Sequence, residues 1–466
     1  MENQSGITPS PMPYGAEERA ALKATIQQAQ KSDLYRERLS SISISDADSW
    51  KKIPLTSRSD LQKAGLSGTR AAPLEKICHY GESSGTSGAS NTTWLTADDL
   101  SANASRIMER HPEVFSPGRI ILNRFPFMAA PAHLIQLVAQ LGGGISIPAG
   151  NINWDVPFPR ALEMAQQTQA EVLAGLPLEP IVLERMAREK GLDPATDFDL
   201  QYFFLGGAPL PPVLQRRIER IWKARVIELY GSTETMLLGT SCQERALHIE
   251  TDLAFCEYLR LNSDEDAIYG EKSRLVVTTL GIEGSPLVRF DTGDVVQRLP
   301  ECPCGDPRPA LRVLGRISDS IQIGKQALFN SEVIEAAGMA ADIIDSSVFF
   351  TIALTDHLLV RIETDSETQR KRLPDARDAF HSCLPNVPCE IEFTEPNAIL
   401  DIDQIGRSPT VYKPVFVSDW KKDRRRLISV TQGMMEWPAP SAQAIGRMAL
   451  RAAKGVLRRR KLKKSL

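Results

Sequence analysis

Residues 202–234 read YFFLGGAPLPPVLQRRIERIWKARVIELYGSTE. The stretch begins with an apolar run, continues through the amphipathic segment VLQRRIERIW, and returns to a second apolar run, ARVIELYG. Apolar residues at helical spacing between two short strand-like runs predict a strand, a helix and a second strand. Small and polar residues follow each predicted strand, namely GGA at 206–208 and GSTE at 231–234. The stretch therefore predicts a β-α-β unit with polar loops at its strand ends.

The same alternation of strand and helix occurs upstream. Residues 119–150 again predict strand, helix and strand, and AEVLAGLP with PIVLERMAREKG adds another pair. This pattern predicts an α/β fold with a largely parallel sheet covered on both faces. After about residue 245 the strands shorten, as in RLVVTTL, which indicates a smaller β-rich unit. From about residue 317 the pattern indicates a further α+β unit.

Length and composition favour a folded protein of two or three domains. The chain has 466 residues, of which 42% are hydrophobic and 24% charged. No apolar run approaches the roughly 20 residues that span a bilayer, and the N-terminus lacks the features of a secretory signal. Seven irregularly spaced cysteines do not indicate a disulfide framework. We therefore expect a cytoplasmic protein.

Charge is distributed unevenly along the chain. Residues 421–466 contain 14 basic and 2 acidic side chains. Residues 1–420 therefore contain 41 basic and 56 acidic side chains, which gives them a net charge of −15. Two interpretations of the basic end remain open: a disordered tail, or a helix that docks on an acidic partner or an anionic membrane surface. We expect no nucleic-acid partner. The apolar stripe of such a helix would contain Ile445, Met448, Ala449, Ala452, Val456 and Leu457.

Five short motifs in a fixed order resemble the adenylate-forming superfamily, which includes acyl-CoA synthetases, peptide-synthetase adenylation domains and luciferases. The motifs are a Ser/Thr/Gly loop at 83–88, GGAPL at 206–210, YGSTE at 230–234, TGD at 292–294 and GRISD at 315–319. Each motif alone is weak, and the order and spacing carry the resemblance. Further segments resemble the phenylacetate–CoA ligase branch: SDLYRERL at 32–39, KKIPLTSRSDL at 51–61, LHIETD at 247–252 and CPCG at 302–305.

The resemblance implies a division of the chain into a large and a small domain. A large N-terminal domain, residues 1–316, would combine mostly parallel, helix-flanked sheets with a β-rich subdomain. A small, mobile α+β C-terminal domain, residues 317–428, would swing about the GRISD hinge, and residues 429–466 would form the basic tail. The pivot carboxylate that usually stands two places after the hinge arginine is replaced here by Ser318.

The activity that the resemblance implies is ATP-dependent activation of a carboxylic acid. An acyl-adenylate would form first, and a thiol of coenzyme A or of carrier-protein phosphopantetheine would then attack it. The basic tail mildly favours a carrier protein, because such proteins are typically acidic. Amide formation with an amine and a degenerate, non-catalytic nucleotide-binding scaffold are the alternatives.

The resemblance also assigns the ATP site. The loop Ser83, Ser84, Gly85, Thr86, Ser87, Gly88 would hold the β- and γ-phosphates, since hydroxyls and backbone N–H groups suit phosphate oxygens and glycines allow close approach. The lysine that often follows this loop is Ala89 here. Thr233 would contact the α-phosphate and Glu234 would hold Mg²⁺. The base and the ribose would be held by Gly206, Gly207, Ala208, Tyr230, Gly231, Ser232, Asp294 and Arg316.

The same relatives place a catalytic lysine on the C-terminal domain and an acid pocket near residues 122–134. Lys413, in IGRSPTVYKP, is the best match for the lysine, and Lys325 is the alternative. Amino-acid-activating relatives usually carry an aspartate in the pocket loop, and none is present between Leu122 and Leu134. An aromatic or other apolar acid is therefore favoured. The expected pocket residues are Phe125, Phe127, Met128 and His133.

A second group of residues suggests a metal site. Cys242 and His248 are followed far downstream by Cys302 and Cys304, which together supply three thiols and one imidazole. This donor set suits a structural zinc ion, and four protein ligands would leave no open position. Cys256 could replace one of the ligands. The alternative is that these cysteines are ordinary buried thiols.

Overall fold

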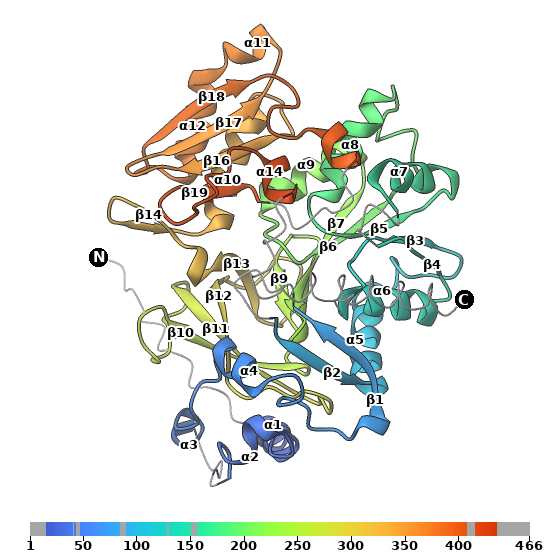
Figure 1. The fold of residues 1–466 in the computed structure, drawn as a ribbon, viewed down its shortest axis with the longest axis vertical. Helices are drawn as coiled ribbons and strands as arrows, with labels where there is room; N and C mark the ends of the chain where they lie inside the picture. Colours follow the sequence, from blue (N-terminus) through green and yellow to red (C-terminus); the bar gives the residue numbers. More distant parts are fainter. Residues whose placement is uncertain are drawn as a thin grey trace, which may run out of the picture.

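The computed structural model describes residues 15–40, 42, 47–83, 90–127, 130–150, 156–407 and 415–435. Its centre is one 11-stranded sheet with the strand order β10-β11-β12-β13-β9-β8-β7-β6-β5-β3-β4, flanked by helices (Figure 1). The predicted α/β class is therefore confirmed. None of the helices in these ranges is long and apolar enough to cross a membrane.

One half of this sheet is parallel and matches the predicted alternation of strands and helices. Its five strands are β3 (Ile120–Asn123), β4 (Ile145–Pro148), β5 (Val172–Gly175), β6 (Tyr202–Gly206) and β7 (Arg225–Ser232). The helices between and before them are α5 (Ala97–Arg110), α6 (Ala130–Leu141), α7 (Phe158–Gln167), α8 (Glu179–Glu189) and α9 (Pro212–Trp222). Alternate side chains of β6 enter opposite cores: Phe203 packs with the α7–α9 cluster and Phe204 with the α5–α6 cluster.

The other half is antiparallel and begins at β7, which pairs in parallel with β6 and antiparallel with β8. Its strands are β8 (Met236–Ser241), β9 (Leu247–Ile249), β10 (Ala254–Arg260), β11 (Lys272–Thr279), β12 (Phe290–Arg298) and β13 (Ala310–Arg316). The predicted β-rich unit is thus continuous with the parallel sheet. The link is the pairing of β13 with β9, which places Ala310 opposite His248.

The N-terminal segments cover the antiparallel half. They comprise α1 (Ala16–Ala29), α2 (Asp33–Arg36), α3 (Ala47–Lys51), α4 (Arg58–Ala64), the 3₁₀ turn η1 (Leu74–Lys76) and a hairpin of β1 (Ile77–Glu82) and β2 (Thr92–Thr96). Tyr35 is fully buried and its hydroxyl donates to Thr56 Oγ1 at 3.1 Å. Thr56 in turn bridges to Phe290 at the start of β12. These contacts hold the beginning of α4 next to β12.

The C-terminal unit contains a four-stranded sheet with the order β18-β17-β16-β19. Its helix α10 contacts α9 of the large domain, and the side chain of Asp342 in α10 accepts a 2.6 Å hydrogen bond from Arg217 of α9. The predicted boundaries at residues 316 and 428, and the mobility of the unit, remain predictions. Its elements are η2 (Ile317–Asp319), β14 (Ile321–Ile323), β15 (Gln326–Leu328), α10 (Asn330–Ile343), β16 (Phe349–Ala353), β17 (Leu358–Glu363), α11 (Glu367–Arg370), α12 (Leu373–Cys383), β18 (Cys389–Thr394), α13 (Ile402–Arg407), β19 (Val417–Asp419) and α14 (Val430–Met435).

Candidate functional site

A small pocket opens where β7 turns into β8, beside β12 and the end of β13. Five of the residues predicted for the nucleotide line it together, although they come from motifs that lie far apart in the chain. Such a position at the carboxyl end of a parallel strand is where α/β sheets commonly bind ligands. The lining residues are Arg58, Gly231, Ser232, Glu234, Thr235, Leu238, Phe290, Thr292, Asp294 and Arg316.

Glu234 is the buried carboxylate of this pocket. Its Oε1 accepts hydrogen bonds from Asn91 Nδ2 at 2.7 Å and from Arg58 Nη2 at 3.0 Å. Burial alone would raise the pKa of Glu234, but Arg58 and Asn91 outweigh burial and hold that pKa below its ordinary value. The carboxylate is therefore ionised at neutral pH, which is the form that a hard cation such as Mg²⁺ requires.

Asn91 also connects Glu234 to the predicted phosphate loop. The backbone N–H of Ser83 donates to the carbonyl of Asn91, and the N–H of Asn91 donates to Ser83 Oγ, both at 2.9 Å. These two bonds close the base of the loop between β1 and β2. Its inner residues Ser84, Gly85, Thr86, Ser87 and Gly88, together with Ala89, lie outside the described residues. Both ends of the loop are consequently held next to Glu234.

Asp294 is the second carboxylate of the pocket. It accepts a hydrogen bond from the Tyr230 hydroxyl at 2.8 Å and lies 3.5 Å from Arg316 Nε. Burial raises the pKa of Asp294 and, more strongly, that of Tyr230, so the tyrosine stays protonated and acts as the donor. The register of β12 and β13 places Asp294 opposite Arg316. A carboxylate with a fixed donor and a cation beside it suits the polar hydroxyls of a sugar.

Two glycines at the end of β6 are required by the backbone. A Cβ on Gly206 would lie 2.3 Å from the carbonyl oxygen of Leu229, so only glycine allows β6 and β7 to approach this closely. Gly207 has a φ of +81°, a conformation that favours glycine. Ala208 follows it half-buried, and Thr233 is half-buried in the turn between β7 and β8. The roles predicted for these residues at the base and the α-phosphate remain predictions.

Arg58 is the one charged side chain among the lining residues that the sequence analysis did not predict. It is the first residue of α4 and directly follows the N-cap Ser57, whose Oγ accepts a 3.2 Å hydrogen bond from the Asp60 N–H. A cation in the first turn of a helix opposes the helix dipole and usually needs another reason to be there. That mismatch was the signal in the sequence. The reason is the ion pair with Glu234.

The predicted acid pocket is only partly assembled. Phe125 is 2% exposed and packs in the α5–α6 core, whereas Phe127 is 36% exposed. The ring nitrogen Nε2 of His133 lies 2.9 Å from the carbonyl oxygen of Phe127. The centroids of the His133 and His79 rings are 4.4 Å apart, and the rings are tilted by 56°. Burial, and to a lesser extent His133, lowers the pKa of His79 to about 4, so this missed residue is neutral. Met128 lies outside the described residues.

The GRISD motif, the predicted hinge, departs from the family pattern at one residue. Ser318, which occupies the usual carboxylate position, donates from its hydroxyl to Asp319 Oδ1 at 2.8 Å. Lys325 is exposed in the turn between β14 and β15. Lys413, the preferred catalytic lysine, lies outside the described residues, as does the basic tail from residue 436 onward. The choice between the two lysines therefore stays a prediction.

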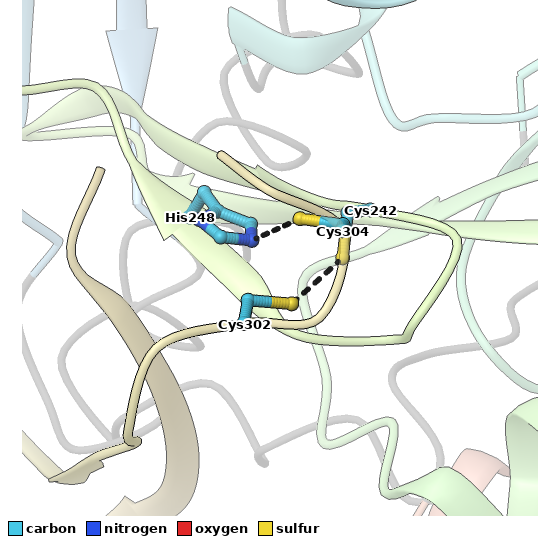
Figure 2. Close-up of side chains that lie close together, drawn as sticks. All are labelled: Cys242, His248, Cys302 and Cys304. Atoms are coloured by element: carbon cyan, nitrogen blue, oxygen red, sulfur yellow. Dashed lines mark hydrogen bonds between the residues drawn. The ribbon is translucent and has the colours of Figure 1, made fainter. Parts of the chain in front are cut away.

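The four residues predicted to bind zinc are brought together away from the pocket (Figure 2). Cys242 follows β8, His248 lies on β9, and Cys302 and Cys304 belong to the loop between β12 and β13. Their potential ligand atoms all lie within 4.8 Å of one another. Cys256, the predicted substitute ligand, lies on β10 opposite Val277 and is not part of this group.

Most of the residues that line the strand-end pocket come from motifs that resemble those of the adenylate-forming superfamily. The AMP-binding enzyme family model matches residues 12–257, which is more than half of the chain. The protein therefore belongs to the AMP-binding enzyme family, as the motifs predicted.

Curated relatives with significant similarity are phenylacetate–coenzyme A ligases. The Thermus thermophilus ligase is 26% identical over 290 residues, a stretch that covers 60% of this chain and 64% of the relative. The Aromatoleum evansii ligase is 24% identical over 382 residues, covering 77% of this chain and 84% of the relative. The match thus spans slightly less than two thirds of the first relative's length.

Solved structures share the fold over nearly the whole chain. A 2-hydroxyisobutyryl-CoA ligase in its postadenylation state, in complex with 2-HIB-AMP, superposes with a TM-score of 0.72, 19% identity, and coverage of 91% of this chain and 95% of the other. An acyl acid amido synthetase in complex with 2,4-DB superposes with a TM-score of 0.64, 14% identity, and coverage of 90% and 93%. At these identities the likeness establishes the fold.

Proposed function

We propose that this protein is an ATP-dependent ligase that converts a carboxylic acid to an acyl-adenylate and then transfers the acyl group to a thiol. Family membership and the names of the curated relatives support adenylation and coenzyme A as the acceptor. The observation that carries the proposal is the position of Glu234. It lies between Asn91, at the base of the predicted phosphate loop, and Arg58, in a pocket that also contains Asp294.

The chemistry explains why these residue types are needed. A carboxylate that attacks the α-phosphate meets electrostatic repulsion, so the site must supply positive charge, hydrogen-bond donors and positioning. Magnesium, when bound, would neutralise phosphate charge. Glu234 is the residue that would hold it, because the ionised carboxylate is already fixed in the pocket. Thr233 and the hydroxyls of the 83–88 loop would position the phosphates, and Asp294 would hold the ribose.

Arg58 has a specific part in this proposal. Many relatives place a lysine directly after the phosphate loop, where this chain has Ala89. Arg58 forms an ion pair with Glu234 and also favours the ionised form of Asp294. The positive charge of Arg58 therefore interacts with both carboxylates. We infer that Arg58 holds Glu234 ionised before the nucleotide binds and then turns to the phosphates. It would thereby supply a positive charge that the position of Ala89 does not.

The acid substrate is proposed to be aromatic or otherwise apolar. Phe127, His133 and the neutral His79 lie together beside the beginning of α6. The described part of residues 122–134 carries no carboxylate to pair with a substrate ammonium. Coenzyme A is the proposed acceptor. A carrier protein recruited by the basic tail is the second acceptor, and an amine is the third, because one structural neighbour is named an amido synthetase. A non-catalytic scaffold remains the rival from another class.

Acid-dependent exchange of labelled pyrophosphate into ATP tests the proposal. We expect the purified chain with Mg²⁺ to catalyse exchange with at least one acid from a panel that spans aromatic, aliphatic, hydroxylated and amino acids. Exchange with none of them would favour the scaffold. A second step then supplies the active acid with coenzyme A, a phosphopantetheinylated carrier protein or an amino acid, and the product identifies the acceptor.

A further inference from the structure

The Cys242–His248–Cys302–Cys304 cluster joins two segments that the chain separates by more than fifty residues. Cys242 and His248 belong to the β8–β9 hairpin, and the other two belong to the β12–β13 loop. The turn of that loop is closed by Gly305, whose φ is +80° and whose N–H donates to the carbonyl of Cys302 at 3.1 Å. This tight turn points both thiols of Cys302 and Cys304 toward the hairpin (Figure 2).

The spacing of the donor atoms fits a tetrahedral metal ion better than a disulfide. Cys242 Sγ and Cys302 Sγ are 3.6 Å apart, and Cys304 Sγ is 3.3 Å from His248 Nε2. A disulfide requires sulfur atoms about 2.05 Å apart. Four ligands around zinc at about 2.3 Å for sulfur would be separated by about 3.8 Å along each edge of the tetrahedron. These two separations are slightly shorter than that edge length, and all four donor atoms lie within 4.8 Å of one another.

The surroundings of His248 select the nitrogen that would bind the metal. His248 is fully buried, and its Nδ1 lies 3.1 Å from the carbonyl oxygen of Arg308. A carbonyl oxygen only accepts, so Nδ1 carries the proton and Nε2 presents its lone pair to the sulfurs. Metal-binding histidines are commonly held by this second contact. The N–H of Asp306 also points at Cys304 Sγ, at 3.5 Å.

We propose that this cluster binds one structural zinc ion and that the ion stabilises the nucleotide pocket from a distance. The strands β8, β12 and β13 run between the two sites, so the cluster lies at one end of them and the pocket at the other. Zinc would fix the β8–β9 hairpin to the β12–β13 loop. The pairing of β12 with β13 in turn places Asp294 beside Arg316.

Metal analysis of the purified full-length chain tests the first part. We expect close to one zinc per chain by mass spectrometry of the element. Co²⁺ added to chain from which zinc has been exchanged should give the absorption bands of tetrahedral thiolate coordination. Cys302→Ser and Cys304→Ser should each lose the metal and melt at lower temperature, because metal binding contributes to the folding free energy. The matched control is Cys256→Ser, a thiol on the same sheet outside the cluster, which should keep its zinc.

Binding of Mg·ATP tests the second part. Reversible removal of zinc should raise the Kd for Mg·ATP several-fold, and restored zinc should lower it again. A chain that contains no zinc and gives no cobalt–thiolate bands overturns the proposal, as does loss of metal from Cys256→Ser alone. An unchanged Kd in the zinc-free chain overturns the coupling. A chain that holds zinc but activates no acid would contradict the proposed function and leave the zinc site intact, so the two failures are distinguishable.

Discussion

The proposed nucleotide pocket and the cysteine–histidine cluster lie at opposite ends of the same strands, and they differ in how their polar groups are paired. In the pocket each carboxylate already has a counter-charge: Glu234 has Arg58 and Asp294 has Arg316. In the cluster the donor atoms face one another, with thiol against thiol and thiol against imidazole. A site of paired charges can fold without its ligand, whereas three thiols and an imidazole gain their full stability only around a cation.

The largest effect is expected from Glu234→Ala, which should damage the pocket and spare the cluster. The substitution removes the proposed magnesium ligand and leaves Arg58 without its partner, so acid-dependent pyrophosphate exchange should fall about 10²-fold or more. Zinc content should not change. The matched control is Glu244→Ala, an exposed carboxylate in the β8–β9 turn. Exchange near the wild-type rate in Glu234→Ala would contradict the magnesium assignment.

A lysine from the C-terminal unit sharpens the comparison, because it should matter for adenylation and for neither folding nor metal content. Lys413→Ala should slow pyrophosphate exchange by roughly 10- to 100-fold, since a cation is lost from the developing charge at the α-phosphate. Thioester formation from a supplied acyl-adenylate should be nearly unchanged. Lys325→Ala serves as the parallel variant. Loss of exchange in Lys325→Ala alone would transfer the role to Lys325, and equal loss in both half-reactions would indicate misfolding.

Arg58→Met tests whether the charge pairing in the pocket is functional. It should raise KM for Mg·ATP about tenfold, as expected for loss of a charge-assisted hydrogen bond, and Arg58→Lys should restore part of the affinity. The control Arg36→Met removes an exposed arginine that pairs with Asp33. An unchanged KM for Mg·ATP in Arg58→Met would show that the ion pair with Glu234 does not contribute to nucleotide binding.

The pH dependence of the same variant provides an independent readout. Arg58 lowers the pKa of Glu234, and burial would raise it. Without Arg58 the pKa should therefore rise, so Mg·ATP binding should be lost at a higher pH as the solution is acidified. The ion pair also stabilises the fold at pH values above the pKa that Glu234 has in the unfolded chain. This stabilisation is lost as the pH falls through the lower pKa that Glu234 has in the folded chain. If Arg58→Met loses Mg·ATP binding at the same acidic pH as the wild-type chain, this role of Arg58 is contradicted.

A feature of the fold or the site could be predicted from the sequence when the residues that cause it lie close together in the chain. Apolar runs that alternate with amphipathic helices identified the parallel half, because each helix covers the strands next to it in sequence. The motif order identified the strand-end pocket. The continuity of the two halves was not predicted, since it depends on β13 pairing with β9, about sixty residues away.

Individual side chains show the same limit. Arg58 was missed because its partner Glu234 lies 176 residues further along the chain. Phe125 was expected in the acid pocket, and its apolar character cannot distinguish a pocket wall from the core in which the structure buries it. The cluster was predictable, because metal ligands of the required types and close spacing form a pattern that few other constraints produce.

The smallest effect is expected when residues 436–466 are removed, a segment that contains none of the residues placed in either site. The position of the cut matters. Val430 and Met434 of α14 are buried, and Thr431 Oγ1 accepts from the N–H of Asp401 at 2.7 Å. A chain that ends at residue 429 should therefore melt at lower temperature, whereas a chain that ends at residue 435 should keep its melting temperature, zinc content and pyrophosphate exchange.

Truncation at residue 435 should change only the encounter with an acidic partner. Deletion of the basic tail leaves the acidic body, so KM for a carrier protein should rise while KM for ATP stays constant. Added salt should weaken the carrier interaction of the full chain and bring it toward that of the truncated one, because exposed charges beyond about 8 Å are screened at physiological ionic strength. If the tail instead serves a membrane, the loss appears in binding to anionic vesicles. Loss of exchange on truncation would mean that the tail supports the body, and the docking interpretation would then fail.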